Sequence, residues 1–433
     1  MAKGFKVKRY NRIYRGGRSP ASRLLHFLGA AAAVCVLGFI GWSAYGPVMD
    51  YLSDDTVSTM KPAESSSQTS SPEVSSSEQA AQKDQSTEEH QTPDQSDPSE
   101  PDPAPSNAGS DIHGIYLPSE ILADATKLDQ SLSSVDTTQF NAVYFDLKNE
   151  AGNVLYRSHI EEASLASSPF DLTAVCNKIK DKGMTPIGRI SAFLDPLAAS
   201  KIKNAGIKYG NSEILWNDDD PARGGKPWLN PYAAPAQEYL MALAEESIQM
   251  GVQTIVYANV CFPTGYSLHL ASYGNVTQSR AEVLSAFIDQ AEQRIMDAGG
   301  TLWVSTSGRD ALTSANNMYG EENPLTLSNE SVVLDARPVQ FGNGIALENF
   351  SVDAPLMNPG ETIDTLLKSL SSDLSGKKVL AVLQGSTAEG QYTNNKPYTA
   401  QDMEDQIAAL HDNGINQFIF YSPDGNYPNQ EAS

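Results

Sequence analysis

The sequence predicts an α/β protein whose main domain, residues 112–427, is a parallel (β/α)8 barrel of the TIM type. Short β-branched or aromatic segments alternate with amphipathic segments from residue 114 to the end of the chain. Glycine follows several of the amphipathic segments, where a left-handed residue ends a helix. Such barrels typically take about 250 residues before insertions, so the length of this region suits eight βα units.

The eight strand segments are short and separated by regions long enough for a helix. They are residues 114–119, 142–149, 185–195, 254–263, 301–307, 331–341, 377–385 and 417–422. Amphipathic helices are predicted at residues 171–182, 234–250, 278–298 and 399–413, each ending next to a glycine. An open doubly wound sheet is the alternative, but no glycine-rich phosphate turn follows the first strand.

The N-terminal region predicts a membrane anchor. Residues 1–23 carry only basic charges, and residues 24–45 carry none apart from a possible charge on His26. The second segment is long enough to span a bilayer, and Trp42 and Tyr45 stand at its far end, where amphipathic rings favour the interface. We expect a cytoplasmic tail, one span in the cell membrane and an extracellular C-terminal domain. A cleaved signal peptide is the competing interpretation.

Residues 46–111 predict a disordered linker, because Ser, Pro and acidic residues dominate and little apolar surface is available to offset the entropy of ordering. A short tail, residues 428–433, follows the barrel. The formal net charge of −23 includes the basic tail, so the outer part is more acidic still. We therefore expect neither nucleic acid nor anionic polymers as partners. Only Cys176 and Cys261 lie outside the span, so no disulfide framework is predicted.

Polar residues gather at the predicted C-terminal ends of the strands, where barrels of this type carry their sites. In strand order they are Asp146, Lys148, Asn149, Arg189, Asp195, Asn259, Cys261, Ser305, Ser307, Asp335, Arg337, Gln340, Gln384, Tyr421 and Asp424. Any single aspartate here could instead cap a helix or form a loop salt bridge. The cluster indicates a site more strongly than any member.

Several stretches together resemble a bacterial family described as putative glycoside hydrolases, which are (β/α)8 barrels that are often exported and membrane-anchored. The matching stretches are residues 114–117, 141–152, 186–197, 228–232, 383–384 and 421–427. The resemblance covers essentially all of residues 112–427. It implies a barrel that engages carbohydrate of the cell envelope or of the surroundings.

The chain departs from the family pattern at acidic positions. The fourth strand of the family usually reads Gln-Phe-Asp-Tyr-Ile-Arg-Phe-Pro, whereas residues 256–263 here place Ala258 at the acidic position and Cys261 at the arginine position. Asn230 and Ser307 stand where the family tends to carry aspartate. Glycoside hydrolysis ordinarily needs two carboxyl groups, so the resemblance implies impaired or lost activity.

Three carboxylates remain as catalytic candidates: Asp146, Asp195 and Asp335. Asp146 and Asp195 match positions that the family keeps, so they could equally be scaffold or ligand-orienting groups. The candidates for substrate binding are Lys148, Arg189, Trp228, Tyr232, Asn259, Arg337, Gln384 and Tyr421. The acidic run at residues 218–220 could arch over the mouth of the barrel, or be a solvated loop.

Aromatic residues crowd the third and fourth βα connections, where they could stack on sugar faces or pack in a core. They are Trp216, Trp228, Tyr232, Tyr257, Tyr266 and Tyr273. Cys261 could be a nucleophile at a strand end, but no motif places a base beside it, and a buried structural thiol is the preferred interpretation.

No zinc spacing, H-E-x-x-H, G-x-S-x-G or P-loop motif occurs, so neither a metal nor a cofactor is expected. Three hypotheses remain for the function. The first is a carbohydrate-binding pseudoenzyme, the second is an active glycosidase with relocated carboxylates, and the third is a surface scaffold that binds a protein partner.

Overall fold

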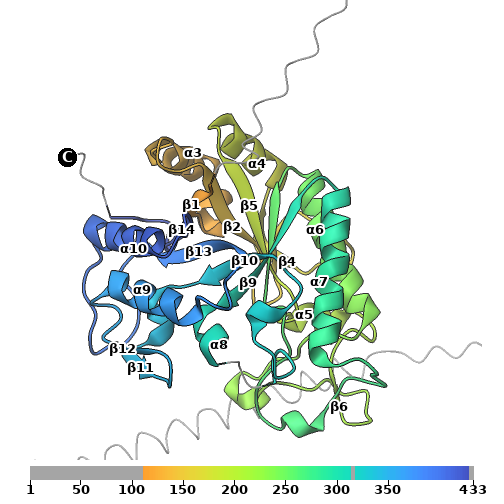
Figure 1. Ribbon diagram of the computed structural model, residues 1–433. Coiled ribbons are helices and arrows are strands. Elements are labelled where there is room, and N and C mark those ends of the chain that lie inside the picture. The colour runs from red at the N-terminus through yellow and green to blue at the C-terminus, as the bar shows by residue number, and fades with distance from the viewer. Residues whose placement is uncertain (1–110, 314–316, 429–433) are drawn as a thin grey trace, which may run out of the picture. The chain divides into compact units, whose positions relative to one another are not determined.

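The computed structural model describes residues 111–313 and 317–428 (Figure 1). The expected basic tail, the membrane span and the linker up to residue 110 lie outside these described residues, as does the C-terminal tail from residue 429. Within the two described ranges, no helix is both long enough and apolar enough to cross a bilayer.

Eight parallel strands form a closed barrel at the centre of the domain, surrounded by helices (Figure 1). The strands are β1 (His113–Tyr116), β2 (Ala142–Lys148), β5 (Thr185–Ser191), β7 (Thr254–Ala258), β9 (Thr301–Ser307), β10 (Ser331–Asp335), β13 (Lys378–Gln384) and β14 (Gln417–Tyr421). Each pairs in parallel with the next in this order, and β1 pairs with both β2 and β14. The pairing confirms the predicted barrel and excludes the open sheet.

The helices begin and end where local chemistry allows. They are α2 (Ser119–Leu122), α3 (Ala125–Ser134), α4 (Leu172–Asp181), α5 (Pro196–Lys201), α6 (Ala234–Gln249), α7 (Arg280–Asp297), α8 (Gly308–Thr313), α9 (Pro359–Leu370) and α10 (Ala400–Asp412). A capping box of Ser279 and Glu282 starts α7, and Thr399 and Asp402 form another at α10. Gly299, just past α7, has the left-handed φ of 87° that the sequence predicted.

The structure adds short strands that the sequence did not predict. β3 (Val154–Tyr156) and β4 (Leu165–Phe170) extend the sheet beyond β2. Two further pairs lie in loops: β6 (Lys208–Tyr209) with β8 (Ala271–Ser272), and β11 (Gly344–Ala346) with β12 (Ser351–Asp353). All of these except β4 have only two or three residues, which carry too little periodicity to be recognised.

Several barrel strands are shorter than predicted. The strands expected over residues 114–119 and 185–195 end at Tyr116 and Ser191, and two others end at turns. The strand expected over residues 254–263 ends at Ala258, because Asn259 adopts a left-handed φ of 55° and turns the chain. The strand expected over residues 331–341 ends at Asp335, and a 3₁₀ turn follows at Pro338–Phe341. Both turns move the polar residues that follow away from the strand axis and onto the rim.

The barrel interior is a buried layer to which every strand contributes. It contains Tyr116, Ala142, Tyr144, Ile187, Val256, Trp303, Val333, Leu380, Val382 and Ile419. Because side chains alternate between faces with a period of two, the inward residues of the next layer follow directly. They are Asp146, Arg189, Ala258, Ser305, Asp335 and Tyr421, which, with Tyr116 and Val382, line the C-terminal mouth of the barrel.

Candidate functional site

One ion-paired group in the mouth lies where β1, β2 and β5 end. Asp146 and Arg189 are neighbours in the β2–β5 register, and Arg189 Nη1 lies 2.8 Å from Asp146 Oδ1. The hydroxyl of Tyr116 donates to Asp146 Oδ2 at 2.9 Å. Arg189 also donates to Glu150. A carboxylate has about four acceptor sites, so these contacts leave about two free on Asp146.

The charges in this group hold each other in place. Burial works against the charge on Arg189, but Asp146, Tyr144 and Glu150 together raise its pKa well above the ordinary value. Burial likewise opposes ionisation of Glu150, yet Arg189 lowers the pKa of this carboxyl. Burial, reinforced by Asp146, raises the pKa of Tyr116, so its hydroxyl stays a proton donor.

A second ion-paired group lies at the end of β10. Arg337 donates to Asp335 from Nε to Oδ1 at 2.8 Å and from Nη2 to Oδ2 at 2.6 Å. The Arg337 backbone N and Gln340 Nε2 also donate to this carboxylate, at 3.3 and 2.7 Å. These four hydrogen bonds use the full acceptor capacity of Asp335. The Arg337 guanidinium lies 4.2 Å from the centre of the Tyr421 ring.

The two groups face each other across the mouth, because β2 and β10 are four strands apart in a ring of eight. The hydroxyl of Tyr144 lies between them in the layer below. Burial raises the pKa of Tyr144, and the charges of Asp146, Arg189, Asp335 and Arg337 all act on it. The mouth is therefore one polar site with two walls.

Lys148 and Asp195 form a separate ion pair that is closed to solvent. Their charged atoms lie 2.7 Å apart, and both side chains are 0% exposed. Asp195 Oδ1 also accepts the Ala198 backbone N–H at 2.8 Å and caps α5. Burial lowers the pKa of Lys148, and the charge of Asp195 opposes that shift. The catalytic role of Asp195 and the binding role of Lys148 stay predictions. The burial of Asp195 favours the scaffold role that the sequence also allowed for it.

The other predicted binding residues divide between the rim and the core. Asn259 Nδ2 donates to Ser191 Oγ at 2.9 Å, and Gln384 Oε1 accepts the Val339 backbone N–H at 3.1 Å. Both side chains therefore connect neighbouring segments at the rim. Tyr232 packs against Phe262 in an aromatic group outside the mouth. The structure brings Asp146, Arg189, Asp335, Arg337 and Tyr421 together and leaves Trp228 and Tyr232 apart from them.

Three of the six aromatic residues named for the third and fourth connections are buried core residues. Trp216 and Tyr257 are fully buried, and Trp228 is 7% exposed, with its indole N–H donating to Asp218 Oδ2 at 2.9 Å. Tyr266, in contrast, is 64% exposed. Core packing therefore explains three of these rings, and Tyr266 remains available at the surface.

The acidic run at residues 218–220 is a structured turn. Asp218 also accepts the Lys226 backbone N–H at 2.7 Å, Asp219 pairs with Arg223 and Asp220 caps a 3₁₀ turn. Each carboxylate thus has a local structural partner. Within the described ranges, no group of three or more His, Cys, Asp or Glu side chains is arranged to hold a metal ion.

Asp310 is a residue of the rim that the sequence interpretation missed. It lies half-buried in the first turn of α8, where its backbone N–H donates to Ser307 Oγ at 3.0 Å. Burial raises the pKa of the Asp310 carboxyl. A hydrogen bond with the Ser307 side chain and the charge of Arg309 oppose the shift, and the charge of Asp335 adds to it. A serine that ends a strand and is followed three residues later by an aspartate is a helix-start signal, which could have indicated this position.

Cys261 is buried, and burial raises the pKa of its thiol. A thiolate is the nucleophilic form of cysteine, so this shift argues against a nucleophilic role. The preferred interpretation of Cys261 as a structural thiol therefore agrees with its surroundings.

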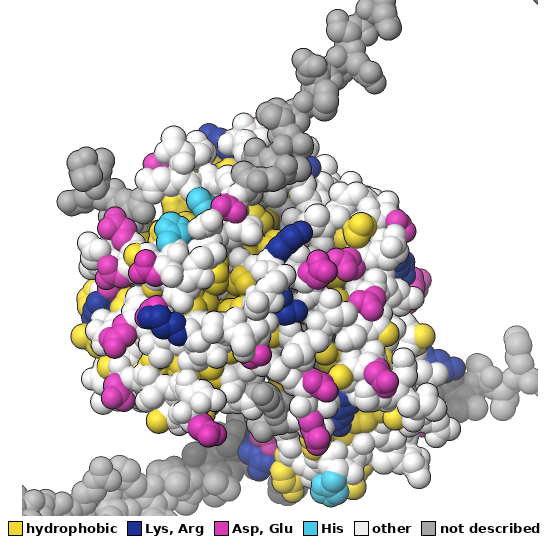
Figure 2. Space-filling model, viewed as in Figure 1, with side chains coloured by type: hydrophobic (Ala, Val, Ile, Leu, Met, Phe, Trp, Pro, Cys, Tyr) yellow, Lys and Arg dark blue, Asp and Glu magenta, His cyan; other side chains and the backbone are white. Residues whose placement is uncertain are grey.

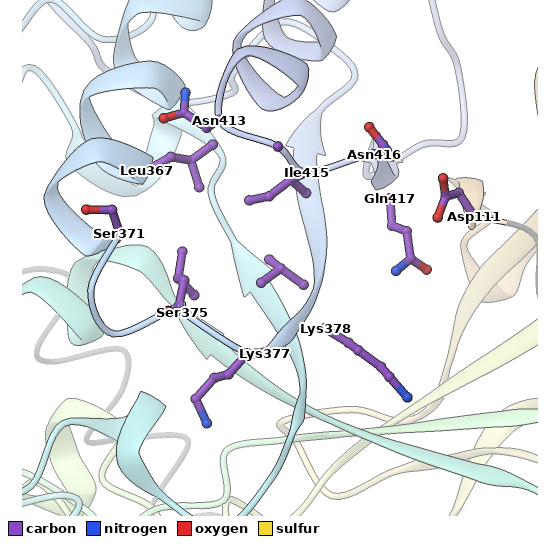
Figure 3. Close-up of a pocket in the computed structure, with 13 residues that line it drawn as sticks. Asp111, Leu367, Ser371, Ser375, Lys377, Lys378, Asn413, Ile415, Asn416 and Gln417 are labelled. Carbon is purple, nitrogen blue, oxygen red and sulfur yellow. The ribbon is translucent and has the colours of Figure 1, made fainter.

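A cavity of about 380 Å³ lies at the opposite end of the barrel (Figure 3). Its lining includes Lys378 and Gln417, the first residues of β13 and β14, and Asn413, just after α10. Conserved chemistry in such barrels lies at the C-terminal ends of the strands, whereas the N-terminal end contributes to stability. We therefore place the candidate site at the polar mouth rather than in this cavity.

Charged side chains are scattered on the one face of the domain that Figure 2 shows. On the face shown in Figure 2, acidic side chains are spread over the surface, with Lys and Arg side chains scattered among them. The paired charges of the mouth thus differ from their surroundings in being held at fixed, short distances.

Comparisons with known proteins agree with this geometry. A family model described as "Putative glycosyl hydrolase domain" matches residues 114–427. Among solved structures, the PgaB (BpsB) glycoside hydrolase domain from Bordetella bronchiseptica superposes with a TM-score of 0.53 at 10% identity, over 73% of this chain and 95% of that one. At that identity the likeness concerns the fold alone.

A hypothetical protein from Ruminiclostridium thermocellum ATCC 27405 is 24% identical, with a TM-score of 0.39, over 44% of this chain and 96% of that one. A search of curated proteins found no match.

Proposed function

Because the chain belongs to the family described as "Putative glycosyl hydrolase domain", we propose that the mouth of its barrel binds a carbohydrate polymer and hydrolyses it poorly. The observation that carries the proposal is the state of the two inward carboxylates. Asp335 accepts hydrogen bonds at all of its sites, and Asp146 is held by Arg189 and Tyr116. Both therefore act as acceptors, and neither is placed to give a proton to a leaving oxygen.

The mouth suits a sugar in several respects. Sugar hydroxyl groups both donate and accept hydrogen bonds. Asp146 offers carboxylate oxygens with free acceptor sites, and Arg189 and Arg337 offer rigid guanidinium donors. Tyr421 adds an aromatic ring that is only partly buried. Ala258, in the mouth layer of β7, supplies no acid at the position where the family pattern has one.

Binding and hydrolysis can be measured on the same sample. The full chain, purified with detergent for the expected span, is heated with soluble oligosaccharides from peptidoglycan, chitin and neutral glucans, and released reducing ends are counted. We expect stabilisation by at least one glycan, about 2.7 kcal/mol at 100 times the dissociation constant, with slow release at most. Asp146→Asn should weaken the stabilisation, whereas Asp171→Asn, at the exposed cap of α4, should not.

Two results would redirect the proposal. Stabilisation by none of the glycans would point to the third hypothesis, a scaffold for a protein partner. Fast release of reducing ends, lost in Asp146→Asn or Asp335→Asn, would establish the second candidate, an efficient hydrolase with relocated carboxylates. That candidate is favoured by one observation, namely that Asp146 and Asp335 face each other across the mouth.

We also propose that the barrel is held outside the cell by the apolar segment at residues 24–45, on the linker at residues 46–111. The support is the basic tail before an uncharged segment of spanning length. Protease added to intact cells should remove the barrel domain from the anchored chain. Protection of the domain until lysis would contradict this location.

A further inference from the structure

The carboxyl groups around the mouth differ in whether a cation accompanies them. Asp146 and Glu150 share Arg189, Asp335 is paired with Arg337, and the nearby buried Asp195 is paired with Lys148. No Lys, Arg or His in the described ranges lies within ion-pairing distance of Asp310. Among these acids, Asp310 alone has no ion pair, although its carboxyl interacts with the Ser307 side chain and with the charge of Arg309.

The fold places Asp310 in the sector of the mouth that lacks an acid on its strands. Ser307, which accepts the Asp310 backbone N–H, is the register partner of Asp335 across β9 and β10. On the other side, the charge of Asp310 acts on Cys261, which follows β7. Asp310 therefore stands above β9, between the strand that carries Ala258 and the strand that carries Asp335.

We propose that Asp310 is the proton donor for hydrolysis of the glycan bound in the mouth, with Asp146 on the far wall as the proton acceptor. The proposal rests on the function proposed above and adds the residues that would carry its slow chemistry. Asp146 qualifies as acceptor because it has about two free acceptor sites, whereas Asp335 has none.

The reaction balances with water as the second reactant. Asp310 gives its proton to the bridging oxygen as the bond from that oxygen to the sugar C1 breaks. The oxygen of a water molecule bonds to C1, and the proton that it loses passes to Asp146. Solvent then returns a proton to Asp310 and removes one from Asp146. An acid and a base on opposite walls leave room for this water, the arrangement of inverting hydrolysis.

A half-buried carboxyl without an ion pair suits the donor role. Burial raises the pKa of Asp310 and the charge of Asp335 adds to the rise, which exceeds the opposing effects of the Ser307 hydrogen bond and the charge of Arg309. The competing explanation is that Asp310 only starts α8, since acidic residues also stabilise the first turn of a helix. Asp310→Asn separates the two roles. An asparagine keeps the shape and can still accept a hydrogen bond, but it has no acidic proton to give.

The experiment compares two classes of substrate in the full chain. Hydrolysis of the stabilising oligosaccharide requires a protonated leaving oxygen, whereas a 2,4-dinitrophenyl glycoside of the same sugar has a leaving group that departs without one. We expect Asp310→Asn to lower the rate on the oligosaccharide by about 10²–10⁴ and to leave the rate on the dinitrophenyl glycoside nearly unchanged. Asp310→Glu should restore part of the first rate. Asp171→Asn, which alters a cap of α4, should change neither.

Each other outcome is decisive. Equal losses on both substrates, or no loss on either, would overturn the donor role. Glycan-dependent stabilisation of the wild-type chain without any release of reducing ends would overturn it too, while leaving the proposed binding function intact. Absence of both stabilisation and release would remove the proposed function and this inference together.

Discussion

The two halves of the barrel mouth treat charge differently. On the side of β2 and β5, Asp146, Glu150 and Arg189 compensate one another, and Lys148 and Asp195 are paired in the interior behind them. On the side of β7 and β9, the inward layer has Ala258 and Ser305, and Asp310 on the rim forms no ion pair with any described residue. In the first half, the charged side chains pair with one another and stabilise the fold. In the second half, the Asp310 carboxyl has a raised pKa, a property common among catalytic groups.

The largest effect is expected from breaking the buried ion pair of Lys148 and Asp195, on the side of β2 and β5. Lys148→Met leaves Asp195 as an unpaired charge inside the protein, so we expect a loss of about 3–5 kcal/mol in the free energy of unfolding, measured with denaturant. The double variant Lys148→Met and Asp195→Leu should recover most of this loss, because neither charge then remains. A single variant as stable as the wild type would show that the pair does not support the fold.

A smaller effect is expected at the mouth itself. Arg189→Met leaves Asp146 and Glu150 next to each other without a cation, and we expect a loss of about 1–3 kcal/mol. As a control, Arg223→Met removes an arginine from an exposed pair with Asp219 and should leave the midpoint of unfolding unchanged. If both variants behaved alike, the compensation in the first half would be no more important than an ordinary surface contact.

On the side of β7 and β9, removing a charge should stabilise the protein rather than destabilise it. The folded state raises the pKa of Asp310 above its ordinary value of 3.8, so the folded protein loses stability as pH rises through the raised pKa. At neutral pH, Asp310→Asn should therefore increase the free energy of unfolding, by about 1.4 kcal/mol for each unit of the shift. At pH 3 the gain should vanish. A loss of stability at neutral pH would mean that Asp310 is compensated after all.

The smallest expected effect concerns Glu150, whose pKa Arg189 lowers from its ordinary value of 4.5. The stability that this ionised carboxyl contributes is present above pH 4.5 and is lost as pH falls through the lowered pKa. Because the side chain is 44% exposed, we expect less than about 1 kcal/mol. Thermal unfolding of Glu150→Gln and the wild type should differ at pH 7 and converge near pH 2. A constant difference would contradict the assignment.

The sequence predicted the barrel well because each strand is a short apolar segment and the long helices have recognisable residues at their ends, such as the capping boxes of α7 and α10. All eight barrel strands lie where they were expected, and α4, α6, α7 and α10 match the predicted helices within three residues at either end. The short pair β6–β8 escaped prediction because a contact between residues far apart in the chain creates it, and the neighbouring strands β11 and β12 have only three residues each.

The site was predicted in outline, since side chains at the ends of parallel strands must meet at one mouth. The sequence did not reveal which way each side chain points or which residue it pairs with. Asp146 and Asp195 both follow from the same sequence pattern, an aspartate at a predicted strand end. In the structure Asp146 faces the mouth, whereas Asp195 is buried and paired with Lys148. Asp310 was missed because it lies on α8, a helix of six residues, which is too short to show a helical pattern of apolar residues in the sequence.

The barrel ring is completed by residues at the two ends of the domain. The hydroxyl of Tyr427 donates to the Tyr116 carbonyl at 2.7 Å and accepts the Tyr116 backbone N–H at 2.9 Å, and β1 pairs with β14 along the same seam. During biosynthesis the first strand is made long before its last partner exists. Until the final residues emerge, β1 has an unpaired edge on which other chains can aggregate. A chain that ends before residue 427 would therefore leave the ribosome without the Tyr427 contacts that stabilise the pairing of β1 with β14.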